Sequence, residues 1–189
     1  MGRKPVTKTT AHLWAAVALA AVLCAGQIAR AANAPPAPEP TKSIDPRLYS
    51  GRWYEIARLP NRLQQDCEAP TSDWSKQSNG GYSLVQTCRV GSPSGPTKTW
   101  RAGATIIDSS RNAKVRVGFF GGFIHQDYWI VDRGDDNSWC IMSTPTSKYV
   151  WIMSRHAVMP SAEKAALAAR AHSLGYDTTR LIYDEQPPA

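Results

Sequence analysis

The sequence predicts an all-β protein, an eight-stranded antiparallel up-and-down β-barrel with one C-terminal α-helix packed outside it. Strand-like segments with turn signals between them recur about every ten residues from position 52 to 154, as an antiparallel sheet requires. A helical pattern appears only after the last of these segments. About 145 residues remain once the amino-terminal leader and its linker are set aside, which fits one domain with a substantial core.

The expected strands are joined in sequence by short turns. Asn79-Gly80-Gly81 is a strong hairpin signal, because two of these residues can take positive φ. A barrel closes on itself and leaves no free edge, whereas the strand count alone also fits a two-sheet sandwich. The strands are expected at residues 52–59, 70–77, 82–90, 98–107, 113–120, 127–133, 138–144 and 148–154.

A helix is predicted from Ser161, its expected N-cap, to Gly175, its C-terminal stop. Its apolar stripe is narrow and Ala-rich, which favours packing against the barrel wall, with a role in oligomerisation as the alternative. The stripe consists of Leu167, Ala171 and Leu174. Residues 178–183 are predicted to form a short ninth strand.

Residues 1–31 have the features of an export signal. Three basic residues precede an apolar core, Leu13–Ala25, that is too short to span a membrane as a mature helix. Ala29-Arg30-Ala31 supplies a cleavage motif, so the mature chain is expected to begin at Ala32. An uncleaved membrane anchor is the alternative. A third possibility is lipidation of Cys24, although the bulky Leu23 stands where a lipoprotein signal prefers Gly or Ala.

The leader also accounts for most of the positive charge. It carries four basic residues and no acids, so the net charge falls from +7 to +3 when it is removed. The remaining Lys and Arg are dispersed among acids, without a basic run interleaved with aromatics. A nucleic-acid partner is therefore not expected. Residues 32–43 are interpreted as a disordered Pro/Ala-rich linker, 44–184 as the domain and 185–189 as a tail.

The titratable residues show no pattern of a metal or catalytic site. Cys67 precedes the second strand and Cys88 ends the third, so these two are expected to pair as a disulfide, with Cys140 reduced; three free thiols are the alternative. No Cys-x-x-Cys occurs, and the histidines outside the leader are scattered. A Gly-x-Ser-x-Gly elbow and a phosphate-binding Gly-rich loop are also missing. We therefore expect no cofactor, no metal and no catalytic residues.

Three motifs resemble those of the lipocalin family, in the branch that contains bacterial lipocalins and apolipoprotein D. They occur in the family's order, and the resemblance covers residues 44–184. The motifs are Gly51-x-Trp53-Tyr54-Glu55-Ile56-Ala57-Arg58, Tyr128-Trp129-Ile130-Val131-Asp132 and Tyr149-x-Trp151-Ile152-x-Ser154-Arg155. The resemblance implies a calycin-type barrel whose narrow end is closed by Gly51, Trp53 and Arg155, with the guanidinium stacked on the indole.

Strand alternation then predicts which side chains face the interior. If Trp53 and Arg155 point inward, positions 55 and 57 follow Trp53, and Asp132 shares the facing of Tyr128 and Ile130. The expected lining of a ligand cavity is Tyr128, Ile130, Tyr149, Trp151, Met153, Val115, Val117 and Phe119. These side chains could instead simply fill the core.

The resemblance implies a carrier of a small hydrophobic ligand, such as a fatty acid or lysophospholipid, with a role in cell-envelope maintenance. Such a protein is expected in the periplasm or secreted, or attached to the outer membrane if Cys24 is lipidated. Two other classes stay open. An enzyme on the same scaffold would need a titratable pair, for which Glu55 and Asp132 are the candidates, and a ligand-free interaction module would need a filled barrel. The sequence does not indicate the oligomeric state.

Overall fold

The computed structural model describes residues 34–186. The predictions for the leader, Cys24, the mature start at Ala32 and the end of the tail lie outside these residues. The elements described below belong to a compact unit that begins at Pro36.

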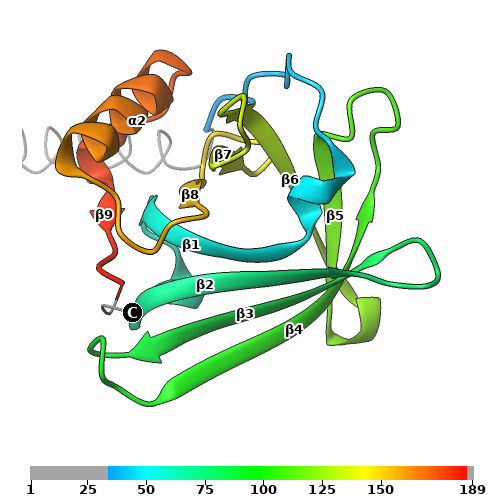
Figure 1. The fold of residues 1–189 in the computed structure, drawn as a ribbon, viewed down its shortest axis with the longest axis horizontal. Coiled ribbons are helices and arrows are strands. Elements are labelled where there is room, and N and C mark those ends of the chain that lie inside the picture. The colour runs from blue at the N-terminus through cyan, green and yellow to red at the C-terminus, as the bar shows by residue number, and fades with distance from the viewer. Residues whose placement is uncertain (1–33, 187–189) are drawn as a thin grey trace, which may run out of the picture. The chain divides into compact units, whose positions relative to one another are not determined.

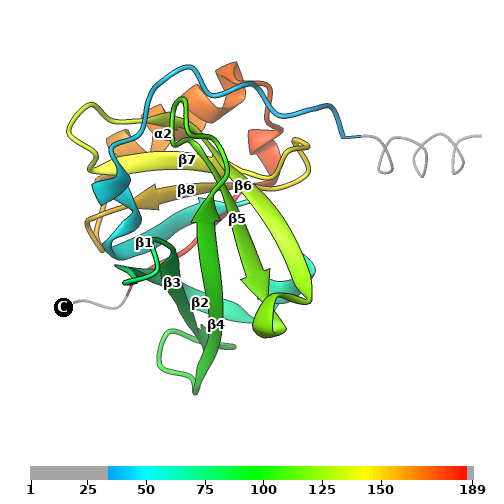
Figure 2. The same ribbon diagram turned by 90° about the vertical axis from the view of Figure 1, so that its right-hand side faces the viewer.

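Eight antiparallel strands form a closed barrel, as predicted (Figures 1 and 2). Each strand pairs with its neighbour in sequence, and the first pairs with both the second and the eighth, which excludes an open sandwich. The strands are β1 (Gly51–Arg58), β2 (Cys67–Lys76), β3 (Tyr82–Val90), β4 (Thr97–Ile106), β5 (Lys114–Phe119), β6 (Ile124–Arg133), β7 (Trp139–Ser143) and β8 (Val150–Ser154).

The helix α2 (Ser161–Ser173) lies outside the barrel (Figure 1). Leu167 and Ala171 are buried and pack with apolar side chains on the outer face of β1, β7 and β8. The predicted N-cap was wrong, because Pro160 occupies that position and no side chain caps the helix. Gly175 does follow the helix, with a φ of +96° that a residue with a β-carbon rarely adopts.

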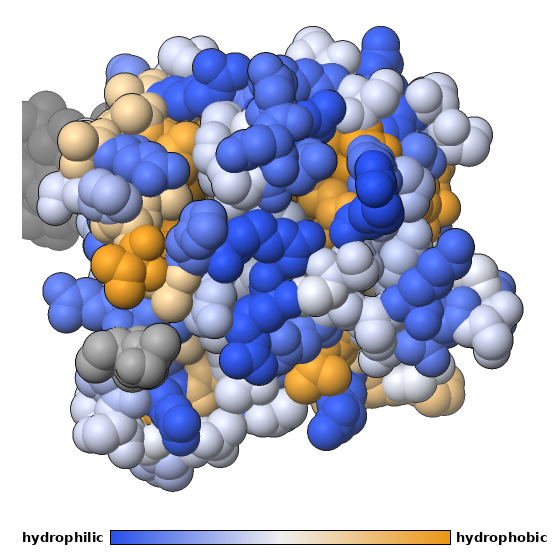
Figure 3. All heavy atoms as spheres, viewed as in Figure 1, coloured by the Kyte–Doolittle hydropathy of each residue, from blue (hydrophilic) through white to orange (hydrophobic). Residues whose placement is uncertain are grey.

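Short elements complete the fold. The 3-10 helices are η1 (Pro46–Tyr49), η2 (Arg62–Gln64), η3 (Phe120–Gly122) and η4 (Thr178–Arg180). The ninth strand, β9 (Ile182–Tyr183), is shorter than predicted because η4 takes up its first part, and it pairs with the end of β1. On the face seen in Figure 3, hydrophobic side chains appear only as small clusters among hydrophilic ones.

Two β-bulges change which side chains face the interior. In β1, Glu55 lies opposite Met153 but Ala57 lies opposite Ile152, so Ile56 is the extra residue. Ile56 and Ala57 both pack outside, under α2. The predicted alternation is correct through Ile56 and wrong from position 57 on, because Ala57 faces out and Arg58 faces in.

The second bulge lies at Val131 in β6. Ile130 lies opposite Met142, but Asp132 lies opposite Ile141, which belongs to the outer cluster under α2. Asp132 therefore does not share the facing of Ile130, contrary to prediction. Its carboxylate instead forms ion pairs on the outer wall with Arg170 of α2 and, at 3.3 Å, with Lys42.

The closed end of the barrel is sealed by Trp53 and Arg155. The Arg155 guanidinium carbon lies 3.8 Å from the centre of the buried Trp53 ring. Its two terminal nitrogens donate to the carbonyls of Arg52, at 2.8 Å, and Leu48, at 2.9 Å. The Trp53 indole donates to the same Leu48 carbonyl at 3.0 Å, which ties η1 to the floor. Gly51 turns into β1 with a φ of +73° beside this arginine.

Cys67 and Cys88 form the predicted disulfide between β2 and β3, and Cys140 is a buried free thiol. Burial raises the pKa of the Cys140 thiol to about 12, so it stays protonated at neutral pH.

The predicted disordered linker is wrong for residues 36–43, which run along the barrel. Pro36 forms an isolated bridge with Thr146, and the Ala37 amide donates to the Pro145 carbonyl at 2.9 Å. Glu39 forms an ion pair with Lys114. These backbone and charge contacts hold the segment even though its composition is that of a flexible tether.

Replacing Arg155 by Ala should lower the free energy of unfolding by about 2 kcal/mol or more, because a desolvated cation–π contact and two hydrogen bonds are lost together. Urea denaturation followed by Trp fluorescence measures this. Arg101→Ala, on an exposed position of β4, is the matched control and should change stability by less than about 0.5 kcal/mol. Equal losses in the two variants would contradict a sealing role for Arg155.

Candidate functional site

The barrel is open at the end opposite Trp53 and Arg155, and a cavity enters it there. Four loops surround the open end, formed by residues 59–66, 91–96, 120–123 and 144–149. Figure 2 shows two of them, the β3–β4 loop and η3, at the same end of the barrel. A cavity of about 320 Å³ extends from this end into the barrel. Leu63 and Phe120, both exposed, belong to its lining and mark the entrance.

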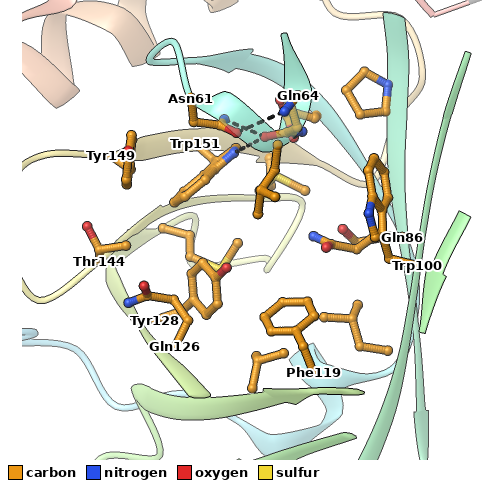
Figure 4. A pocket seen from close by; sticks show the side chains of 18 of the residues that line it. Asn61, Gln64, Gln86, Trp100, Phe119, Gln126, Tyr128, Thr144, Tyr149 and Trp151 are labelled. Atoms are coloured by element: carbon orange, nitrogen blue, oxygen red, sulfur yellow. Dashed lines mark hydrogen bonds between the residues drawn. The ribbon is translucent and has the colours of Figure 1, made fainter. Parts of the chain in front are cut away.

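The cavity walls are mostly apolar and come from nearly all strands. Figure 4 shows Asn61, Gln64 and Trp151 along one side, with Phe119 and Tyr128 across from them. Burial raises the pKa of the Tyr128 phenol to about 12, which keeps it neutral. The apolar side chains of the wall are Trp74, Leu84, Trp100, Val117, Phe119, Ile124, Met142, Trp151 and Met153.

Six of the eight predicted lining residues border this cavity, namely Val117, Phe119, Tyr128, Tyr149, Trp151 and Met153. The other two, Val115 and Ile130, do not. Val115 is fully buried in the packed core, and Ile130 borders a much smaller void of about 20 Å³ below, beside Trp53 and Cys140. The reason is depth, because both residues lie nearer the sealed end, where side chains fill the barrel.

Sequence reasoning missed the lining residues from β2, β3 and β4. They are Pro70, Thr71, Ser72, Trp74, Leu84, Gln86, Thr87 and Trp100. Several of them could be predicted from the alternation within residues 82–90 and 98–107, by the same rule that predicts the inward side chains of the later strands. The loop residues that line the entrance carried no such periodic signal.

Gln64 of η2 holds the β1–β2 loop against the cavity wall (Figure 4). Its side-chain oxygen accepts from the Trp151 indole at 3.0 Å and from the Asn61 amide at 2.7 Å. Its side-chain nitrogen donates to the Glu55 carboxylate at 2.8 Å. One glutamine thus connects the loop, the wall and a buried acid.

Glu55 belongs to a buried ionic cluster with Arg58 and Asp184. Arg58 faces inward because of the β1 bulge, and it donates to Glu55 at 3.2 Å and to Asp184, which follows β9. All three side chains are at least 95% buried. Arg58 also donates to the carbonyls of Gln64 and Cys67, which fixes the start of β2.

One arginine cannot neutralise two buried carboxylates. Burial, and then the neighbouring Asp184 charge, raises the pKa of Glu55 to about 8. Burial likewise raises the pKa of Asp184 to about 6. One oxygen of Asp184 has no hydrogen-bond partner among the described residues. The cluster therefore favours holding one proton between the two acids.

The described residues offer little for metal or covalent chemistry. No group of three His, Cys, Asp or Glu side chains within residues 34–186 could hold a metal ion. Among the residues that the structure describes, Glu55 is the only carboxylate that lines the cavity, because Asp132 lies on the outer wall. No helix in residues 34–186 is long and apolar enough to cross a membrane.

A β-barrel with one sealed end, one open end and an apolar interior defines a ligand-binding type of fold. The sequence model of the lipocalin-like domain matches residues 44–186, and the chain belongs to the lipocalin family. This confirms the resemblance that the three motifs indicated.

The relatives fall in the branch that was predicted. The chain is 27% identical over 169 residues to the outer membrane lipoprotein Blc of Vibrio cholerae, covering 87% of this chain and 96% of that protein. It is 26% identical over 157 residues to apolipoprotein D of Mus musculus, covering 80% and 82% respectively. Among solved structures, insecticyanin from the tobacco hornworm Manduca sexta has a TM-score of 0.64 at 16% identity, covering 82% of this chain and 88% of that one. That likeness shows the fold alone.

We expect stability to fall as the pH rises from about 5 to about 8. The folded-state pKa of Glu55 lies above its unfolded value, so in this window the folded chain binds more protons than the unfolded chain, and stability is lost as the pH rises. One proton gives a slope of at most about 1.4 kcal/mol per pH unit. Urea denaturation across this range measures it. Glu55→Gln should flatten the dependence, and an unchanged slope would contradict the assignment.

Proposed function

We propose that this protein binds one elongated hydrophobic molecule, such as a fatty acid or lysophospholipid, with its acyl chain in the barrel cavity. The observation that carries the proposal is the cavity, open at one end and walled by aromatic, aliphatic and Met side chains. Its volume of about 320 Å³ falls in the usual range of ligand pockets, about 300–1,000 Å³. Burial of apolar surface, worth ~25 cal/mol per Å², would supply most of the affinity.

The proposed ligand enters with its acyl chain first and leaves its polar end at the mouth. Within residues 34–186, Arg62 is the one permanently cationic side chain in the lining, and it is exposed at the entrance. We propose that it orients a carboxylate or phosphate by a charge-assisted hydrogen bond. Arg58 cannot serve this purpose, because its guanidinium is already occupied by Glu55 and Asp184.

Sequestration and transfer, rather than reaction, fit the lining better. Both oxygens of Glu55 accept hydrogen bonds, from Arg58 and from Gln64, which argues against a free general base. Asp132, the second candidate acid, faces away from the cavity. The unfilled space argues likewise against a ligand-free module, since that alternative requires side chains to fill the barrel.

We further propose that the protein acts outside the cytoplasm, either in the periplasm, secreted, or attached to the outer membrane through Cys24, and serves the cell envelope. The support is the predicted export signal together with relatives that are named outer membrane lipoproteins. Metabolic labelling with a clickable fatty acid tests the attachment. A label that disappears in Cys24→Ser would support it, and an unlabelled wild-type chain would rule it out.

Val117→Trp should abolish acyl-chain binding. The indole would project from a buried wall position into the cavity and occupy the space that the chain needs, lowering affinity at least about tenfold. Quenching of Trp fluorescence on titration with oleate, together with native mass spectrometry, measures the affinity and the stoichiometry.

Thr105→Trp is the matched control for this substitution, because it adds the same ring at an exposed position on the adjacent strand β4. It should bind as the wild type does. Urea denaturation of both variants shows whether either has lost its fold. A folded Val117→Trp variant that still binds oleate with wild-type affinity would place the ligand elsewhere.

Arg62→Ala should weaken binding of a fatty acid by about fivefold, the size expected of an exposed charge pair. Binding of the corresponding fatty alcohol should hardly change, since the alcohol has no charge to pair. The ratio of the two affinities is therefore the measurement. Equal losses for acid and alcohol would mean that Arg62 only shapes the entrance and does not read the headgroup.

A further inference from the structure

Large apolar side chains are exposed together at the open end of the barrel. Phe123 is 92% exposed and Phe120 is 74% exposed, both in the β5–β6 connection. Leu63 of the β1–β2 loop and Ile124 at the start of β6 are also exposed. We call these four residues the apolar rim. Three of them line the cavity entrance, whereas Phe123 does not.

The β5–β6 loop holds the exposed rings of Phe120 and Phe123 in a backbone conformation that is energetically unfavourable. Phe120 has a φ of +52°, a left-handed conformation that is unfavourable for a bulky residue, and two glycines with positive φ follow it. The loop therefore combines a strained backbone with exposed aromatic rings. Single exposed apolar side chains are common on protein surfaces. A group of them at one end of the molecule usually marks an interaction site.

The charges around the rim are more often basic than acidic. Arg62 and Lys148 lie in the surrounding loops, and neither forms an ion pair with another described residue. Lys98 is matched by Asp66 at 3.2 Å, and Arg89 lies opposite Glu68 in the β2–β3 ladder. In this region four basic side chains, Arg62, Arg89, Lys98 and Lys148, stand against two acidic ones, Asp66 and Glu68, so the charge around the rim is net positive.

We propose that the open end docks on an anionic phospholipid surface, with the apolar rim inserted among the acyl chains and Arg62 and Lys148 at the headgroups. Exposed aromatic and Leu side chains flanked by Lys or Arg are the combination that binds membrane interfaces. Because the rim surrounds the cavity entrance, a lipid would pass between bilayer and barrel without crossing water. This rests on the proposed function for its cargo.

Charge distinguishes this surface from an interface with a second copy of the chain. A two-fold symmetric contact through the rim would bring the unmatched Arg62 and Lys148 of both copies to the same interface. An anionic bilayer instead neutralises them. The membrane is therefore the occupant that the charges favour, and self-association becomes an outcome of the test.

The test is flotation with vesicles of equal parts phosphatidylcholine and phosphatidylglycerol. Every protein in this test, including the reference, is exported with the Cys24→Ser substitution, so that no acyl anchor contributes to vesicle binding. Phe123→Ser should lower the partition coefficient about tenfold, since an exposed phenyl ring no longer enters the bilayer. Lys148→Ala should lower it by roughly fivefold on these vesicles, and hardly at all on pure phosphatidylcholine.

Val158→Ser is the matched control. Val158 is 71% exposed and lies in the segment that follows Arg155 at the sealed end. This variant should float as the wild type does. Oleate binding without vesicles should be unchanged in Phe123→Ser, because Phe123 does not line the cavity.

The outcomes separate docking from ligand binding. A wild-type chain that does not float, or Phe123→Ser and Val158→Ser variants that float equally, would overturn the docking proposal even if oleate still binds. A chain that is dimeric by light scattering, becomes monomeric on Phe123→Ser and does not float would assign the rim to self-association. Vesicle binding lost with Phe123→Ser in a chain that never binds oleate would support docking and remove the proposed function.

Discussion

The structure depends on closure of the barrel through β1, which pairs with β8 on one side and with β2 on the other. Closure alone would leave both ends alike. The stacked pair of Trp53 and Arg155 seals one of them, and hydrogen bonds to Leu48 draw η1 across the same end. Side chains fill the barrel above this floor, so the remaining space lies toward the opposite end, where the loops surround the cavity.

The bulges in β1 and β6 then decide which charges turn toward the barrel interior and which turn toward the helix. A bulge reverses the facing of every later residue on its strand. In β1 it brings Arg58 inward, where Glu55 and Asp184 surround it. In β6 it turns Asp132 outward to Arg170 of α2. The β1 bulge thus builds the buried ionic cluster, and the β6 bulge provides the ion pair that attaches the helix.

The periodic features could be read from the sequence. Strand boundaries, helix, sealing pair and disulfide followed from alternation, turn residues and the family motifs. The facing of Ala57, Arg58 and Asp132 could not, because a single inserted residue leaves no trace in local composition. The role of Gln64 was also hidden, since its partners Glu55 and Trp151 are distant in sequence and meet only in the closed barrel. Residues 36–43 show the same limit, because tertiary contacts override their linker-like composition.

The account centres on an acyl chain held inside the barrel. The most direct measurement is a crystal structure of the protein with a fatty acid brominated along its chain, read by anomalous scattering. We expect bromine peaks between Trp151, Phe119 and Tyr128, with the carboxylate near Arg62. Bromine peaks only on the outer wall, or an empty barrel at saturating ligand, would contradict the account.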